Sequence, residues 1–369
     1  MSFVGRVKRR VLVAMSGGVD SSVAAYLLVR GGYEVTGVFL CLGGAVEAGH
    51  DTRGCCSPAD AADARRVAER LGIDLFLLDA GRDFAGIIDY FVAEYARGRT
   101  PNPCIHCNTL IKFGALIARA DAVAARYVAT GHHARMVDGR IHRSPEKDQS
   151  YSLFGIARGQ LERVLLPIGQ VAAKAEVRRI AAELGLHVAE KPDSQEICFV
   201  SGDYAELLRR RRPEALRPGN VVDSAGNILG RHDGVGHFTI GQRRGLGVAV
   251  GVPMYVTRLD PESATVTVGP ADETFSRRLS ASEANWHVDP PPAGSEFDAI
   301  VQIRYNHAGA PGKVRITAPD RFQVEFADPV TAVTPGQAAV IYDGDRLLGG
   351  GWIDNANAHE RNENANSRE

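Results

Sequence analysis

The stretch Val11 to Ser22, VLVAMSGGVDSS, decides the fold. Its first half is an apolar run that predicts a buried strand, and its second half opens an amphipathic helix. Gly17 and Gly18 allow backbone N–H groups to turn toward an anion, and a helix N-terminus adds a partial positive charge. The stretch therefore predicts an anion site between a strand and a helix. A plain Gly-Gly turn with serine capping is the alternative interpretation.

The chain on either side of this loop repeats the same alternation. The apolar runs EVTGVFL and DLFLLDA, and later ARYVATGHHAR, are separated by helical patterns such as PADAADARRVAERLGI. Strands that alternate with helices of this length predict βαβ units and a parallel sheet covered on both faces. We therefore expect residues 1–205 to form a doubly wound α/β domain, with ARYVATGHHAR in its sheet.

Beyond residue 205 the sequence predicts β structure instead. Prolines and glycines separate short alternating strands such as MYVTRLD and ATVTVGP, and a second break occurs at DPPP, after which DAIVQIRY, KVRITA and RFQVEFA alternate with period two. We expect a small β domain at 206–283 and a compact β barrel or sandwich at 284–355. The polar remainder, 356–369, is expected to be disordered.

Charge and hydropathy limit the partners of the chain. Lys plus Arg (43) balance Asp plus Glu (44), so a nucleic-acid partner must be held by local basic patches. The run Arg209 to Arg212 is one such patch, or else a solvated helix end. No apolar run approaches the roughly 18 residues of a membrane span, so we expect a cytoplasmic protein without a membrane partner.

Six cysteines in 369 residues are too sparse for a disulfide scaffold, so we expect thiols that are free, metal-bound or catalytic. Cys104 and Cys107 lie in TPNPCIHCNTLIKF, which we interpret as a Pro-rich loop leading into an amphipathic helix. Their CxxC spacing suits half of a zinc site, a redox dithiol, or a nucleophile with a neighbour. The spacing alone leaves these three uses open.

The segment SGGVDSS lacks the lysine of a P-loop and the GxGxxG spacing of dinucleotide folds. It resembles the PP-loop of the ATP pyrophosphatase superfamily, whose members split ATP to AMP and pyrophosphate while activating a carbonyl oxygen as an adenylate. The resemblance implies ATP, with Mg²⁺, as cofactors, and Asp20 either holds Mg²⁺ or caps the helix. The implied nucleotide-binding residues are Ala14, Met15, Ser16, Gly17, Gly18, Val19, Asp20, Ser21, Leu40 and Gly131.

Five strings together resemble the bacterial tRNA-specific 2-thiouridylase family. In chain order they are SGGVDSS, PNP-x-x-x-CN-x-x-IKF, TGH-x-AR, KDQSY and DS-x-x-ICF, and the resemblance covers essentially the whole folded chain. It implies replacement of the C2 oxygen of an anticodon wobble uridine by sulfur. A sulfur donor, either a cysteine desulfurase or a sulfur-relay protein, is implied as a second partner beside tRNA.

The resemblance assigns a role to two cysteines. Cys107, before Asn108, is the implied nucleophile, and Cys198, in ICF, is the implied persulfide carrier. Many members have Asp where this chain has Cys104, so Cys104 is a bystander, a redox partner or a protective thiol. Both working thiols need thiolate character, for which Lys112 and Lys191 are the candidates nearby in sequence.

A stacked wobble base is out of reach, so the enzyme is expected to extract it into a pocket. The resemblance places Asn102, Pro103 and Cys104 against the extracted base. The remaining implied tRNA contacts are His132, Lys147, Asp148, Gln149, Arg304, Tyr305 and Gln337.

Two other functions compete. Another ATP pyrophosphatase, an amidotransferase or ligase acting on a small molecule, explains the loop but not the cysteine motifs or the trailing β domains. A zinc-containing RNA-binding module would use Cys55, Cys56, Cys104 and Cys107, although two adjacent cysteines suit a tetrahedral site poorly. An iron–sulfur cluster is a related alternative. We expect no metal site in the protein itself.

Overall fold

A computed structural model describes residues 9–42, 57–171, 173–192, 197–200, 204–248 and 251–357. Three groups of predictions fall outside these ranges: Cys55 and Cys56, the DSQE part of the Cys198 motif, and the tail beyond residue 357. The chain divides into two compact units. Unit 1 contains Met1–Ile88, Pro103–Gly202 and Asp345–Leu347, and unit 2 contains Asp89–Asn102, Asp203–Gly344 and Leu348–Glu369.

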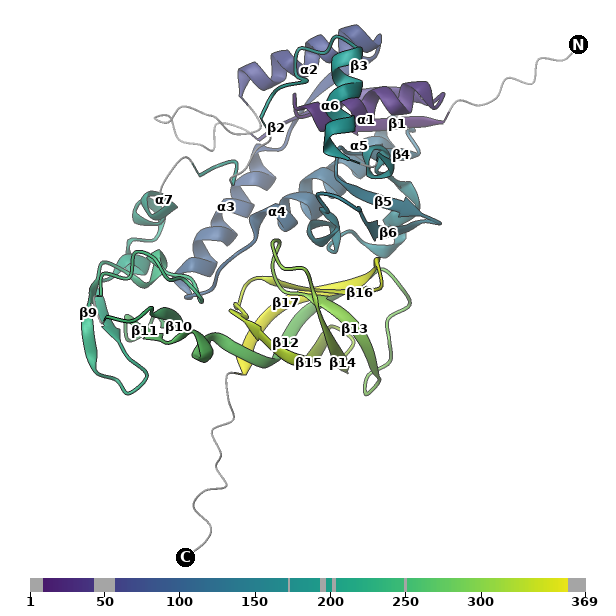
Figure 1. The fold of residues 1–369 in the computed structure, drawn as a ribbon. Coiled ribbons are helices and arrows are strands. Elements are labelled where there is room, and N and C mark those ends of the chain that lie inside the picture. The colour runs from purple at the N-terminus through teal and green to yellow at the C-terminus, as the bar shows by residue number, and fades with distance from the viewer. Residues whose placement is uncertain are drawn as a thin grey trace, which may run out of the picture. The chain divides into compact units, whose positions relative to one another are not determined.

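Unit 1 is built on a five-stranded parallel sheet of order β3-β2-β1-β4-β7 (Figure 1). Its strands are β1 (Arg10–Ala14), β2 (Glu34–Cys41), β3 (Asp74–Asp79), β4 (Tyr127–Ala129) and β7 (Val164–Leu165). Its longer helices are α1 (Val19–Arg30), α2 (Pro58–Leu71), α3 (Gly81–Ala96, which continues into unit 2), α5 (Leu116–Ala122) and α6 (Lys174–Glu183). The order reverses direction at β1, as in a doubly wound fold, which confirms the predicted α/β class.

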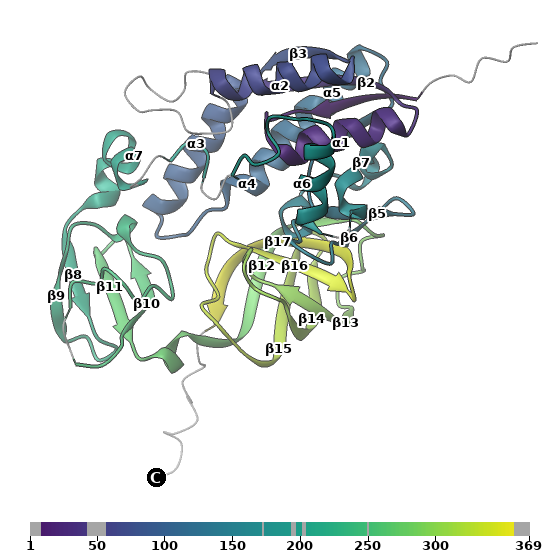
Figure 2. The ribbon, with the colours of Figure 1, turned by 45° about the horizontal axis from the view of Figure 1, so that its top comes forward.

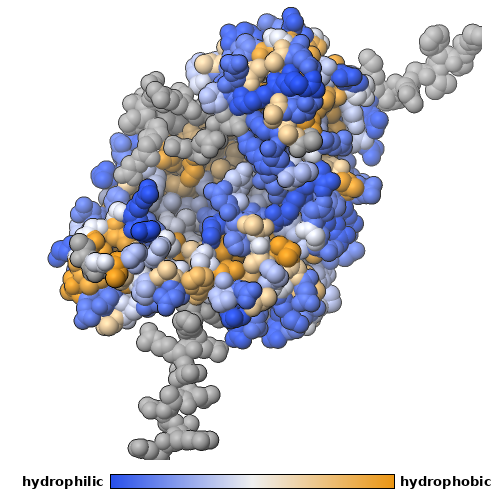
Figure 3. All heavy atoms as spheres, viewed as in Figure 1, coloured by the Kyte–Doolittle hydropathy of each residue, from blue (hydrophilic) through white to orange (hydrophobic). Residues whose placement is uncertain are grey.

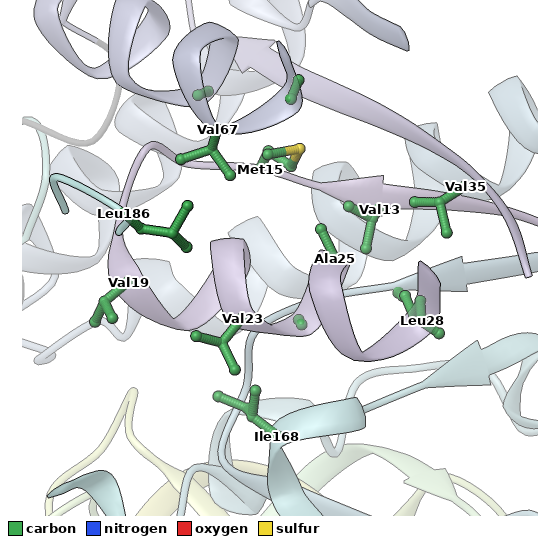
Figure 4. Close-up of a cluster of buried hydrophobic side chains, with 14 of the residues drawn as sticks. Val13, Met15, Val19, Val23, Ala25, Leu28, Val35, Val67, Ile168 and Leu186 are labelled. Atoms are coloured by element: carbon green, nitrogen blue, oxygen red, sulfur yellow. The ribbon is translucent and has the colours of Figure 1, made fainter. Parts of the chain in front are cut away.

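The core of unit 1 follows from the alternation of β1. Val11, Val13 and Met15 are buried in one cluster with residues of α1, α2 and α6, whereas Leu12 is buried outside this cluster. Figure 4 shows side chains of β1 and α1 meeting within this cluster. Because successive side chains of a strand point to opposite faces, both faces of β1 are covered, and α5 contacts β1 and β4. The expectation of a sheet covered on both faces is confirmed (Figure 2).

Helix α2 is defined by local sequence signals at both ends. The Ser57 hydroxyl accepts from Asp60 N at 3.1 Å, and the Asp60 carboxylate accepts from Ser57 N at 3.1 Å, which completes a capping box. Gly72 ends the helix in the left-handed conformation, with φ of 65°. The first turn of α2 lies beside the Gly17 turn, where a Cβ on Gly17 would come within 2.3 Å of Asp60 O.

The prediction that ARYVATGHHAR lies in the parallel sheet is correct only for β4. After Ala129 the chain turns away, and β5 (Ala134–Val137) pairs antiparallel with β6 (Arg140–Arg143). The intervening Gly131 packs so closely on α1 that a Cβ would lie 2.6 Å from Asp20 C. The chain leaves the sheet at this close approach, which no periodicity in the sequence indicates.

Short helical segments make up the rest of unit 1. They are α4 (Pro103–His106), the π-helix η1 (Cys107–Ala115), η2 (Ser150–Leu153), η3 (Arg158–Arg163) and η4 (Pro167–Gln170). Residues 345–347 join this unit through the β5–β6 hairpin, where Arg143 N donates to Asp345 O at 2.8 Å.

Unit 2 contains a small four-stranded sheet of order β10-β11-β8-β9. Its strands are β8 (Gly219–Val222), β9 (Ile228–His232), β10 (Tyr255–Asp260) and β11 (Thr265–Gly269), accompanied by α7 (Tyr204–Arg211), η5 (Pro213–Leu216), η6 (Val235–His237) and η7 (Ala271–Thr274). Val221, Val256, Val266 and Val268 are buried in its core. The MYVTRLD and ATVTVGP strands are confirmed as β10 and β11.

The C-terminal part of unit 2 is a closed barrel, one of the two architectures expected. The strands are β12 (Phe275–Trp286), β13 (Glu296–Gln302), β14 (Ala310–Ala318), β15 (Arg321–Thr331), β16 (Ala338–Asp343) and β17 (Arg346–Asn357). The ring closes because β12 pairs with both β15 and β17. Buried and exposed residues alternate along β14 and β15, as the period-two sequence pattern predicts.

Hydrophilic residues dominate the face drawn in Figure 3, with apolar residues interspersed among them. The largest exposures of apolar side chains in the described chain are those of Ile228 (65%) and Val252 (63%). Among the described residues no helix combines the length and the apolar character that a membrane crossing requires.

We predict that Phe322→Ala destabilises the barrel by about 3–5 kcal/mol, because it empties a fully buried site. Both tryptophans of the chain, Trp286 and Trp352, belong to the barrel strands, and the Trp286 ring lies 6.0 Å from that of Phe322. Tryptophan fluorescence during denaturant unfolding therefore measures the loss. Phe275→Ala, at a site that is 38% exposed, is the control and should cost less than about 1 kcal/mol.

Candidate functional site

The loop between β1 and α1 is arranged to receive an anion. Gly17 has φ of 72°, and Gly18 caps α1 without a side-chain hydrogen bond to the helix N-terminus. Ser21 Oγ accepts from Ser16 N at 3.1 Å and donates to Gly18 O at 3.1 Å. The N–H groups of the first turn of α1, and the partial positive charge of this helix end, therefore face the space in front of the loop, where an anion would bind.

Gly17 needs to be glycine for two reasons. Its φ lies in the left-handed region, and a Cβ would meet Asp60 O, in the first turn of α2, at 2.3 Å. The turn is therefore packed directly against a second helix. Ala14, Met15 and Val19 flank it, and Met15 N donates to Val38 O at 2.9 Å.

Gly131 and Leu40 occupy the same edge of the sheet as this loop. Gly131 follows β4 and packs on Asp20 and Ser21, and Leu40 lies in the last two residues of β2. Parallel strands end at one edge, so the predicted nucleotide residues of β1, β2 and β4 share the edge at which α/β folds bind ligands.

Asp20 is held by two basic side chains from distant parts of unit 1. Lys174 Nζ donates to both carboxylate oxygens, at 2.5 and 2.7 Å, and His133 Nε2 lies 3.2 Å from Oδ1. Burial alone would raise the pKa of Asp20, but the hydrogen bonds with His133 and Lys174 outweigh it and lower that pKa. The carboxylate is therefore ionised at neutral pH and keeps the Lys174 cation beside the loop.

The described residues offer no cage of protein ligands for a magnesium ion. No group of three or more His, Cys, Asp or Glu side chains within the described ranges is placed to hold a metal ion. Asp20, the predicted ligand, already accepts from Lys174 through both oxygens.

The interpretation of Cys104 and Cys107 as loop residues is wrong. Cys104 lies in α4 and Cys107 begins η1, a π-helix in which the i→i+5 pattern replaces the usual i→i+4 bonds. Cys104 is exposed and Cys107 is half-buried, and neither forms a disulfide. Pro103 is the first residue of α4, a position at which proline is tolerated. A π-helix has no distinct sequence signal, which explains the error.

Hydrogen bonds connect the Cys107 helix to Asp20. Asn108 Nδ2, next to Cys107, donates to Ser152 O at 2.9 Å, and Ser152 N donates to Gln149 O at 3.0 Å. Gln149 in turn accepts from His133 N through Oε1 at 2.8 Å. His133 Nε2 lies 3.2 Å from Asp20 Oδ1. These contacts therefore extend from the Cys107 helix to the loop between β1 and α1, which we call the phosphate loop.

Cys198 lies next to a fixed aromatic contact. The Phe199 ring packs edge-on against Phe84, with centroids 5.5 Å apart, and Phe84 is in the first turn of α3, directly after β3. Cys198 is half-buried and outside any disulfide. The Phe199 contact therefore puts this thiol near the end of β3, on the ligand-binding edge of the sheet.

His132 is an interior histidine. Its ring is buried, Nδ1 lies 2.7 Å from Thr130 Oγ1, and Phe113 of η1 is 6.1 Å away between ring centroids. Burial, assisted by the charges of Lys112 and His133, holds the pKa of His132 well below its usual 6.5. The ring is neutral at physiological pH and its orientation is set by Thr130.

The KDQSY segment is ordered by its own side chains. Asp148 accepts from Ser144 N at 3.0 Å, Ser150 N at 3.1 Å and Ser150 Oγ at 2.8 Å. Lys147, just before it, has φ of 51°. Asp148 and Gln149 thus have structural partners in addition to the RNA contact predicted for them.

Unit 2 carries the remaining predicted tRNA residues. Gln337 Nε2 donates to Thr100 O at 3.0 Å and Pro101 O at 3.3 Å, which brings Gln337 to the chain directly before Asn102. Arg304 Nη1 donates to Thr331 O at 2.8 Å, and Tyr305 is 44% exposed. The Arg209 to Arg212 run lies at the end of α7, where Arg211 pairs with Asp89 at 2.6 Å.

Sequence reasoning missed Lys174. It is the first residue of α6, 154 positions beyond Asp20, and no motif in KAEVRR connects the two. One signal was present: the phosphate loop lacks the lysine of a P-loop, so a cation had to come from elsewhere in the chain.

Family models match three successive parts of the chain. The model described as tRNA methyl transferase HUP domain matches residues 9–202. Those described as tRNA methyl transferase PRC-barrel domain and aminomethyltransferase beta-barrel domain match residues 205–270 and 276–353.

Curated relatives are similar over almost their whole length. The tRNA-specific 2-thiouridylase MnmA of Rhodopirellula baltica is 47% identical over 390 residues, covering 95% of this chain and 97% of that protein. The protein of the same name from Carboxydothermus hydrogenoformans is 47% identical over 368 residues, covering 96% of this chain and 99% of that protein.

A solved 4-thiouridine synthetase–RNA complex with bound ATP is 16% identical, with a TM-score of 0.35, and covers 56% of this chain and 50% of that chain. A likeness this partial has no bearing on the assignment.

We predict that the stability of the chain falls as the pH drops below about 6.5, with His132 contributing to the fall. In that range the unfolded chain binds a proton at this histidine, whereas the folded chain does not, so protonation favours unfolding. His132→Asn retains a polar atom near Thr130 Oγ1 and should make thermal unfolding less dependent on pH between 5 and 7. An unchanged pH dependence in this variant would contradict the prediction.

Proposed function

Because the chain belongs to the tRNA-specific 2-thiouridylase family, we propose that it replaces the C2 oxygen of the wobble uridine of tRNA with sulfur in an ATP-dependent reaction. Relatives of this name are 47% identical over at least 95% of the chain. The single observation that supports the proposal best is the common location of the predicted parts. Three predicted parts adjoin the carboxyl edge of one parallel sheet: the phosphate loop, Gly131, and Cys198 with its neighbour Phe199.

In the proposed first step, uridine O2 attacks the α-phosphorus of ATP, pyrophosphate leaves, and AMP becomes bonded to O2. The Gly17 turn and the α1 N-terminus bind the phosphates, and Lys174, positioned by Asp20, balances their charge. Leu40 contacts the adenine. AMP on O2 is a good leaving group, so C2 becomes open to attack by sulfur. Since the described residues form no group of three metal-ligating side chains, Mg²⁺ would be held by the phosphates, whose charge it would offset.

The second step uses Cys107 and Cys198. Two sequences of thiol reactions give the same products. Either Cys107 attacks the Cys198 persulfide and releases HS⁻, which attacks C2 and displaces AMP, or the terminal persulfide sulfur attacks C2 and Cys107 then cleaves the S–S bond. Both produce 2-thiouridine, AMP and a Cys107–Cys198 disulfide. An external thiol reductant must supply two electrons, and a cysteine desulfurase or sulfur-relay protein must supply the next sulfur.

For the tRNA, we propose extraction of the wobble base against Asn102, Pro103 and Cys104. Gln337 supports this segment through its bonds to residues 100 and 101. The other proposed tRNA contacts are His132, Lys147, Asp148, Gln149, Arg304, Tyr305 and Gln337 itself. His132 is neutral, so it acts as a hydrogen-bonding group and not as a cation.

We propose further that residues 1–205 form the adenylation and thiolation domain, 206–283 a small central β domain and 284–355 a tRNA-contacting domain, followed by the tail 356–369. Because the proposed substrate is tRNA, we propose the cytoplasm as the location of the enzyme.

A zinc module is not favoured, because two of its four ligands, Cys55 and Cys56, would be adjacent in the chain, which suits a tetrahedral site poorly. A small-molecule ligase of the same superfamily remains the second candidate, favoured by the phosphate loop alone.

We predict that the purified chain forms 2-thiouridine in unmodified tRNA when it is supplied with ATP, Mg²⁺, cysteine and a cysteine desulfurase. Cys198→Ser should still release pyrophosphate in a tRNA-dependent manner but form no thiouridine, because adenylation needs no thiol. Cys41→Ser changes a half-buried thiol at the end of β2 that has no assigned role, so it is the control. Thiouridine formation by Cys198→Ser would exclude the persulfide role, and tRNA-independent pyrophosphate release would favour the small-molecule ligase.

We also predict that Asp20→Ala and Lys174→Met each slow pyrophosphate release by about tenfold or more, the effect of losing one charge-assisted contact at the phosphates. Lys174→Met should be the more severe, since it also leaves the Asp20 carboxylate without its cation beside the phosphates. Lys313→Met, on an exposed position of β14, should leave the rate unchanged. Normal pyrophosphate release by Lys174→Met would refute its proposed role.

A further inference from the structure

Lys191 makes three hydrogen bonds that join separate parts of unit 1. Its Nζ donates to Asp60 Oδ1 and Asp63 Oδ2, each at 2.6 Å, and to Gly17 O at 3.1 Å. An ammonium group has three N–H donors, so these contacts use all of them. One lysine therefore connects the first turns of α2 to the carbonyl of the phosphate-loop glycine.

The bond to Gly17 O sets the direction of a peptide group in the loop. In a planar trans peptide the C=O and N–H bonds point in opposite directions. When Lys191 holds the Gly17 carbonyl toward α2, the Gly18 N–H faces the opposite way. In a loop that binds an anion through its backbone donors, the orientation of this peptide decides whether one donor is available.

The acidic pair keeps Lys191 charged and in place. Burial opposes the charge, but the hydrogen bonds that Lys191 donates to Asp60 and Asp63 outweigh burial and raise the pKa of Lys191. His187 Nε2 supports Asp63 from the other side, 2.8 Å from Oδ1. The cation is therefore present at every pH at which the protein is expected to work.

The backbone of Lys191 is also fixed. Arg178 Nη2 donates to Lys191 O at 3.0 Å and its Nη1 donates to Ala189 O at 2.7 Å. The preceding Val188 is 1% exposed and belongs to the unit 1 core. Cys198 follows seven residues later, so its Cα lies within about 25 Å of this fixed point however the chain runs between them.

We propose that Lys191 is a positioning residue that holds the Gly17–Gly18 peptide in its anion-binding orientation and anchors the start of the Cys198 segment to the phosphate loop. This inference rests on the proposed function, because it assigns Lys191 to the same site. It replaces the idea that Lys191 activates a thiolate: all three of its donors are used by Gly17, Asp60 and Asp63.

The test separates nucleotide binding from sulfur transfer. Lys191→Met keeps the length of the side chain and removes the charge. It should weaken binding of the α,β-methylene analogue of ATP by about tenfold, as expected for one lost charge-assisted bond. It should also lower the yield of thiouridine per pyrophosphate released, because the anchor of the Cys198 segment is lost.

Three further variants make the result decisive. Lys191→Met leaves Asp60 and Asp63 without their cation, so Lys191→Met/Asp63→Asn removes one of the two charges and guards against misfolding. Lys313→Met makes the same substitution at an exposed position of β14, away from Gly17 and the acidic pair, and it should leave both analogue affinity and yield unchanged. Lys191→Arg keeps the charge and should recover part of the affinity.

The outcomes distinguish the possible failures. Unchanged analogue affinity and unchanged yield in both Lys191→Met chains would overturn the inference. A fall in pyrophosphate and thiouridine by one common factor, with unchanged affinity and a lower melting temperature, would mean a purely structural role and would also overturn it. Absence of thiouridine from the wild-type chain would refute the proposed function, whereas the analogue titration would still report on Lys191.

Discussion

The phosphate loop depends on a steric constraint at Gly17. The residue has φ of 72°, and its Cα faces the Asp60 carbonyl so closely that no side chain fits between them. On the other side of the loop, Gly131 packs on the backbone of Asp20 and Ser21 with equally little space. The loop is thus held between α2 and the chain after β4. This confinement keeps its donors in place before any ligand arrives, which reduces the ordering cost of binding.

Two lysines reach the loop from distant parts of the chain. Lys174 is paired with Asp20 inside the site, and Lys191 is bonded to the Gly17 carbonyl from behind the loop. Each is held by carboxylates, so neither cation depends on a bound nucleotide for its position. The arrangement differs from a P-loop, where a lysine within the loop contacts the phosphates, because here the cations come from α6 and from the chain that leads to Cys198.

The thiols are positioned by elements of different kinds. Cys107 begins a π-helix that is fixed to Ser152 through Asn108, whereas Cys198 is located by the packing of Phe199 on Phe84. A π-helix widens one turn and recurs at functional sites, where it re-aims side chains. The contacts of Asn108, Ser152, Gln149 and His133 extend from this helix to Asp20.

The sequence by itself determined the α/β class, the β-rich C-terminal half and the family, because hydrophobic period, glycine placement and motif spacing are local properties of the chain. It also indicated which residues lie in the loop between β1 and α1. Only the tertiary structure decided that ARYVATGHHAR leaves the sheet after Ala129, that Cys104 and Cys107 are helical, and that Lys174 and Lys191 join the loop. These features arise from contacts between residues more than 100 positions apart, or from helix geometry without a sequence signature, and local patterns carry no information about either.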